Sequence, residues 1–175
     1  MSLKLTRFAI VAGAMIWPVL VLAAEGINIP APESHLIRQK SAYSVQETVS
    51  RLKADIASKK IVLFDDIDQA ALASAAGIKL SPQHLIIFGN PPLGIQFLTS
   101  NQYSGLDWPV RMLVLQDANG DVWVAYTDFD EIARRNAITD RDPAFKMASQ
   151  VAASIASVSQ RPSDHADHQA HPSGP

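Results

Sequence analysis

The spacing of apolar residues predicts a helix near the start of the compact part of the chain. From Val45 to Ile56, apolar residues recur three and four positions apart, which places their side chains on one helix face. Just before them, Ser44 and Glu47 form a capping box, a common helix start. The pattern therefore predicts an amphipathic helix over residues 45–59.

Short runs of apolar or alternating residues predict strands. They lie at residues 35–41, 61–64, 84–88, 110–115 and 122–127. Between the last two runs, Asp117-Ala118-Asn119-Gly120 is typical of a hairpin turn.

The segments between these runs predict two loops and further helices. Residues 65–68 are polar and predict a loop, and residues 89–92 (Gly-Asn-Pro-Pro) predict a stiff turn. An alanine-rich segment that ends at Gly77 predicts a short helix, and residues 130–136 predict a closing helical turn. Asp142-Pro143 marks the start of a last helix with a small-residue apolar face.

This order of elements predicts an α+β domain, a β-α-β(4)-α-like antiparallel sheet with helices packed on one face. A sheet of this kind leaves its other face to water, a ligand or a partner. We therefore expect a homodimer or a small-molecule complex that uses the exposed sheet face.

The N-terminus resembles a secretory signal peptide. Lys4 and Arg7 precede an apolar run from Phe8 to Leu22, and a small residue at Ala23 suits signal cleavage. The run is short for a membrane span. We expect cleavage after Ala23 or Ala24, no stable membrane anchor afterwards, and a periplasmic or secreted protein.

The chain therefore divides into five segments. These are a signal peptide (1–23), a flexible leader (24–35), an α+β domain (36–138), a C-terminal helix (139–160) and a disordered tail (161–175).

Composition excludes several classes of function. The chain has 17 acidic and 15 basic residues and no cluster of basic ones, so it lacks the positive surface that binds nucleic acid. It has no cysteine, which excludes thiol catalysis, thiolate metal sites and iron–sulfur clusters.

Five motifs, in this order, resemble the domain-of-unknown-function family 302 (DUF302). They are Tyr43-Ser44-Val45-x-Glu47-Thr48, Phe64-x-x-Ile67-Asp68, Leu85-Ile86-Ile87-Phe88-Gly89-Asn90-Pro91, Leu106-Asp107-x-Pro109 and Val122-Trp123-Val124-x-Tyr126. The resemblance covers residues 36–138 and implies an α+β fold of the TATA-binding-protein-like class. It implies no particular reaction.

At three positions this sequence departs from the family pattern. Typical members carry histidine after the Ile-Asp pair, methionine near the middle of the chain and histidine after the arginine of the closing helix. Here those positions hold Gln69, Leu98 and Asn136. Histidine and methionine bind transition metals and haem iron, so we expect neither in the domain.

Three aspartates form the first candidate site. Asp65, Asp66 and Asp68 could bind a hard cation, and Asp65 or Asp66 could serve as the general base of a hydrolase. The alternative is a solvated loop in which Asp68 caps the next helix.

Two further candidate sites follow strands. Asn90 lies where a strand ends, a common place for ligands, and alternatively belongs to a stiff turn. Asp107 and Arg111 could orient a small polar ligand beside Trp108, or Trp108 fills the edge of the core. With residues from the family-like motifs, the predicted ligand-binding set is Asp68, Gln69, Asn90, Asp107, Trp108, Arg111 and Tyr126.

The tail carries His165, His168 and His171 with interleaved aspartates. Such a tract can capture copper or zinc, or it is an inert solubilising end.

Together these features predict an exported, non-enzymatic module without a resident cofactor that binds a small molecule or a partner protein. The alternatives are copper or zinc handling by the tail, and hydrolysis by Asp65 or Asp66.

Overall fold

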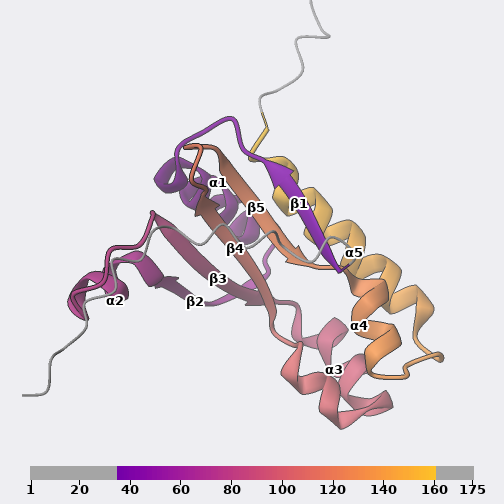
Figure 1. Cartoon of the computed structure of the whole chain (residues 1–175). Helices are drawn as coiled ribbons and strands as arrows, with labels where there is room; N and C mark the ends of the chain where they lie inside the picture. The colour runs from indigo at the N-terminus through magenta and orange to yellow at the C-terminus, as the bar shows by residue number, and fades with distance from the viewer. Residues whose placement is uncertain (1–34, 161–175) are drawn as a thin grey trace, which may run out of the picture.

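The computed structural model describes residues 35–160 (Figure 1). The predicted signal peptide, the leader apart from His35, and the tail with His165, His168 and His171 lie outside the described residues. Within residues 35–160, no helix has the length and hydropathy needed to cross a membrane.

The described residues form one antiparallel sheet with helices, in the strand order β1-β5-β4-β3-β2. The predicted α+β class is confirmed. In chain order the elements are β1 (Leu36–Lys40), α1 (Val45–Ser58), β2 (Val62–Asp68), α2 (Gln69–Ala75), β3 (Gln83–Gly89), α3 (Pro91–Ser100), the 3-10 helix η1 (Gln102–Leu106), β4 (Val110–Gln116), β5 (Val122–Thr127), α4 (Phe129–Arg135) and α5 (Asp142–Ser157).

The local signals that predicted α1 and the hairpin are present in the structure. Ser44 accepts a hydrogen bond from the Glu47 amide at the start of α1. In the β4–β5 turn, Gly120 has a φ of 83°, a left-handed conformation that glycine adopts without strain.

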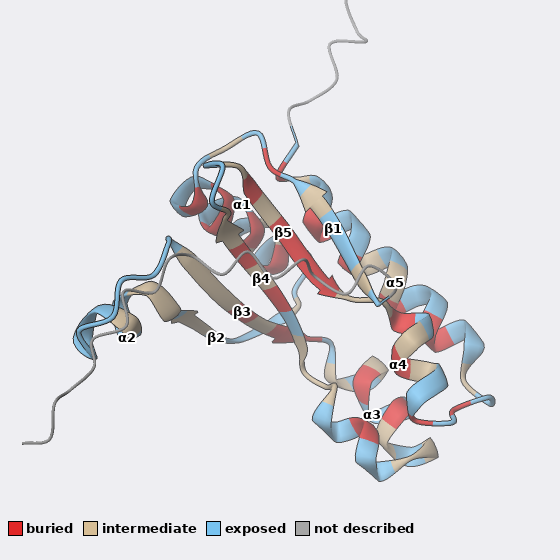
Figure 2. Ribbon diagram, viewed as in Figure 1, coloured by how far each residue is buried: buried red, intermediate tan, exposed pale blue. Residues whose placement is uncertain are grey.

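The core lies between one sheet face and the helices α1 and α5 (Figures 1 and 2). Phe88, Ile86, Met112, Val114 and Val124 on the sheet are almost fully buried. The buried face of α5 is rich in alanine, and small side chains let a helix approach its neighbours closely. The last helix is therefore part of the same core as the sheet.

The polar loop expected at residues 65–68 is wrong, because β2 continues through Asp68. A β-bulge between Leu63 and Asp65 shifts the register of this edge strand. Asp66 then pairs with Ile86 and Asp68 with His84. An edge strand tolerates such polar residues because part of it faces water.

The stiff turn expected at residues 89–92 is also wrong, since these residues lead directly into α3. Asn90 is the N-cap and accepts a hydrogen bond from the Leu93 amide. Pro91 and Pro92 occupy the first two helix positions, where a missing backbone N–H costs nothing.

Candidate functional site

An apolar pocket of about 200 Å³ lies where the ends of β3 and β4 meet α3 and α5. A cavity of roughly 150 Å³ is large enough for benzene. Its apolar lining includes Ile61, Phe88, Leu93, Phe97, Val110, Trp108, Phe129, Met147 and Val151. The shape and lining are typical of a site for a small apolar molecule.

Trp108 contributes the one indole ring of this pocket, and two glycines make room for it. A Cβ atom added at Gly94 would lie 1.9 Å from Trp108 Nε1, and one added at Gly89 would lie 3.1 Å away. The first distance is far inside van der Waals contact, so α3 can approach the indole only because residue 94 is glycine. On the side of β2, Phe64 contacts Trp108 edge-on, with ring centroids 5.8 Å apart.

The Trp108 Nε1–H has no hydrogen-bond acceptor among residues 35–160. The other described tryptophan differs, because Trp123 Nε1 donates to Asp117 Oδ2 at 2.8 Å. A fully buried tryptophan N–H usually finds a partner, but among residues 35–160 the one buried side-chain polar atom without a partner is Ser104 Oγ, so Trp108 Nε1 is accessible from the pocket. The Trp108 donor is therefore available to a ligand in the pocket.

Two polar side chains also line the pocket, Lys59 and Asn90. Lys59 Nζ is paired with Asp55 at 2.5 Å, and the Asn90 side-chain oxygen caps α3. Lys59 Nζ and the Asn90 oxygen therefore have partners. The Asn90 side-chain N–H groups have no acceptor in residues 35–160, but Asn90 is exposed to water, so the partly buried indole N–H is the donor best placed to orient a ligand inside the pocket.

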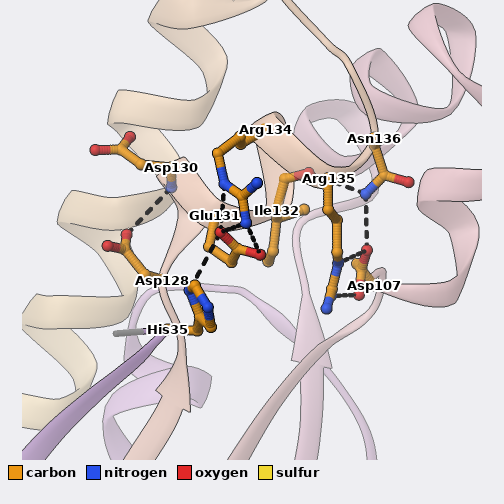
Figure 3. Close-up of polar contacts among 9 residues, drawn as sticks. All are labelled: His35, Asp107, Asp128, Asp130, Glu131, Ile132, Arg134, Arg135 and Asn136. Atoms are coloured by element: carbon orange, nitrogen blue, oxygen red, sulfur yellow. Dashed lines mark hydrogen bonds and ion pairs between the residues drawn. The ribbon is translucent and has the colours of Figure 1, made fainter. Parts of the chain in front are cut away.

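Asp107, directly before Trp108, is held by the end of α4 (Figure 3). Its side chain is only 8 % exposed. Asn136 Nδ2 donates to Asp107 Oδ2 at 2.8 Å, and Arg135 Nε donates to the same oxygen at 3.0 Å. These bonds attach the segment that carries Trp108 to α4, so Asp107 positions the indole.

The predicted Asp107–Arg111 pair is present at 3.7 Å, but it does not face the apolar pocket. Arg111 donates a hydrogen bond to the Leu106 carbonyl. Neither Asp107 nor Arg111 lines the pocket that contains Trp108.

The remaining predicted site residues lie elsewhere. Asp68 caps α2 by accepting from the Ala71 amide at 2.8 Å, and Gln69 accepts from Gln83 Nε2 at 2.6 Å. Tyr126 is 5 % exposed within the core, and this burial, with nearby Asp128, raises the pKa of its hydroxyl.

His84, at the start of β3, is only 14 % exposed in its side chain. Its Nδ1 lies 2.9 Å from Asp66 Oδ1, and Lys53 Nζ lies 2.7 Å from Asp66 Oδ2. Burial raises the pKa of the Asp66 carboxyl, but the bonds from Lys53 and His84 lower it by more, to below its ordinary value. A carboxylate held ionised in this way is a weak general base.

An open polar depression of about 460 Å³ lies beside His84, with Ser44, Gln46, Asp68 and Gln83 in its lining. No group of three or more histidine, cysteine, aspartate or glutamate side chains in residues 35–160 is placed to hold a metal ion. The pocket at Trp108 is the better candidate, because its apolar walls gain more from covering the apolar surface of a ligand.

Replacing Asp66 with Asn should destabilise the fold in a pH-dependent manner. The lowered pKa means that the ionised carboxylate stabilises the folded state above about pH 4, and that this contribution is lost as the pH falls further. We expect D66N to lose about 1–2 kcal/mol at neutral pH, since Lys53 is partly exposed. Urea unfolding at neutral and acid pH measures the difference.

The matched control is D65N, because Asp65 is exposed and an asparagine can still accept from the Asp66 amide. A D66N deficit that stays the same into acid would contradict the assigned ion pair.

Comparison with known proteins identifies relatives for most of the described residues. The family model described as "Domain of unknown function DUF302" matches residues 37–161. A crystal structure of an uncharacterized conserved DUF302 protein from Bacillus stearothermophilus has a TM-score of 0.64 and 14% sequence identity, and it covers 70% of this chain and 96% of that one.

Curated relatives come from Brucella. The fluoride-specific ion channel FluC 1 of Brucella suis biovar 1 (strain 1330) is 37% identical over 106 residues, which are 61% of this chain and 42% of that protein. FluC 1 of Brucella abortus biovar 1 (strain 9-941) is likewise 37% identical over 106 residues, with 39% of its length covered. The chain thus spans about two-fifths of the length of these relatives.

The family match covers well over half of the chain, includes the last helix, and agrees with the observed fold. The chain belongs to the DUF302 family.

Proposed function

We propose that this protein binds a small, mostly apolar molecule with one hydrogen-bond acceptor, in the pocket beside Trp108. The observation that carries the proposal is an indole N–H without an acceptor in residues 35–160, at an apolar pocket of about 200 Å³. Apolar walls supply affinity through burial, and one donor orients the ligand. An aromatic ketone has this chemistry.

Acetophenone and isopropylbenzene make a matched pair of probes, because they have similar shapes and only the ketone has an acceptor. We expect both to bind, and only acetophenone to move the Trp108 indole N–H resonance downfield in NMR titrations. The Trp123 indole, which already donates to Asp117, is the internal reference.

Two substitutions locate the binding. In W108F the donor is lost, so acetophenone affinity should fall about twofold to tenfold, while isopropylbenzene affinity should change little. V151F fills the pocket from α5 and should abolish the binding of both probes. The control S154F, at an exposed position of the same helix, should bind both probes like the wild type. Unchanged binding by V151F would disprove the site.

The proposal includes export, which rests on the N-terminal pattern of Lys4, Arg7 and the apolar run from Phe8 to Leu22. Mass spectrometry of protein from the parent organism should give an N-terminus at Ala24 or Glu25, in the extracytoplasmic fraction. An intact N-terminus on cytoplasmic protein would contradict export.

A second candidate function is an accessory role in fluoride handling. It is favoured by the 37% identity to part of two fluoride-specific channels. We expect a deletion strain to be inhibited by lower fluoride concentrations than its parent, and the intact gene to restore growth. Equal fluoride tolerance of the two strains would remove this candidate.

A further inference from the structure

The sheet face turned away from α1 and α5 is unusually apolar. Strand register places Ile67, Leu85, Leu113 and Ala125 side by side across β2, β3, β4 and β5. These residues alternate with the core residues Ile86 and Met112 along their strands, so they lie on the opposite face.

Further apolar residues widen this row into a patch. The outer face is defined here by Ile67, Leu85, Ile87, Leu113, Leu115 and Trp123, all of them only partly buried. No helix of residues 35–160 covers β3, β4 and β5 on this side in Figures 1 and 2. The exposed side of an antiparallel sheet is normally polar, and a contiguous apolar patch marks an interaction surface.

Charge differs between the two edges of the outer face. Arg38 and Lys40 lie at the β1 edge, in register with Ala125 and Trp123. Asp65 lies at the opposite edge, on β2, where it pairs with Ile87. Lys40 is already paired with Asp121 at 2.7 Å. Arg38 therefore carries the positive charge of the β1 edge, and Asp65 carries the negative charge of the β2 edge.

We propose that the outer face packs against the outer face of a second copy of this chain, about a two-fold axis parallel to β4. The central strand is β4, so this rotation lays β1 of one copy over β2 of the other. Arg38 of each copy then lies only two residues along the strand direction from the level of Asp65 of the other copy, within reach of its long side chain, and the apolar centres meet. Such self-complementarity is the requirement for a two-fold interface, and opposite charges fix its register.

Arg111 lies on the outer face of the central strand, in register with Ile87, so the proposed axis brings the Arg111 residues of the two copies near each other. Each Arg111 donates to the Leu106 carbonyl and lies 3.7 Å from Asp107 Oδ1. Its charge is thus partly balanced within its own copy.

The area of the outer face indicates how strongly two copies should associate. Five strands spaced about 4.8 Å apart, with about six residues each at about 3.3 Å, span roughly 24 by 20 Å. A standard interface buries about 800 Å² on each partner, so this face is at the small end of the range. We expect a dimer that dissociates on dilution.

Analytical ultracentrifugation of the full chain across a dilution series tests the proposal. At high concentration we expect the wild type to have twice the monomer mass. At the same concentration L113K should be a monomer, and its circular dichroism spectrum should match that of the wild type. The control A153K adds the same charge at an exposed position of α5 and should dimerise like the wild type. A monomeric wild type at every concentration, or an L113K dimer, would overturn the proposal.

Charge reversal tests the orientation separately from folding. R38E places like charges together at both symmetry-related contacts and should weaken the dimer about tenfold. The double variant R38E/D65R restores opposite charges and should recover most of the association. If the double variant dimerises no more tightly than R38E, the proposed axis is wrong. None of these positions lines the pocket, so the result is independent of ligand binding.

Discussion

The packing of the Trp108 indole against Gly94 is the contact on which the rest of the site depends. The closeness of α3 to the indole is set by the absence of a side chain at residue 94. The segment before the indole is held by the Asp107 carboxylate, which accepts from Arg135 and Asn136 at the end of α4. Any side chain at position 94 would push α3 or the indole away, and the pocket would change shape.

The sheet separates two surfaces with different chemistry. Its inner face forms the core with α1 and α5, and the pocket lies at the end of this layer. Its outer face is apolar without being covered by any element of residues 35–160. Ligand binding and self-association can therefore proceed on opposite sides of the sheet.

Much of the fold could be predicted because its signals are local. The capping box at Ser44 and the turn that ends at Gly120 involve neighbours in the sequence, and both are present. The extension of β2 was missed because a bulged edge strand with three aspartates has no regular alternation. Helix α3 was missed because Asn-Pro-Pro suits a turn as well as a helix start. The signal that distinguishes them is the helical spacing of Leu93 and Phe97, four positions apart.

The site was predictable only in part. Asn90 and Trp108 were among the predicted ligand-binding residues and both line the pocket. The partners of Asp107 are 28 and 29 positions away in the sequence, so no local pattern could show that Arg135 and Asn136 hold it. The same holds for His84, whose position beside Asp66 depends on the register of β2 and β3.

A crystal structure of the protein with 4-bromoacetophenone would show whether the pocket beside Trp108 binds an aromatic ketone, because anomalous scattering from bromine locates the molecule without bias. We expect one molecule between α3 and α5, with its carbonyl oxygen within hydrogen-bond distance of Trp108 Nε1. A pocket closed by its own side chains, or a bound molecule whose carbonyl points away from the indole, would contradict the proposed binding mode.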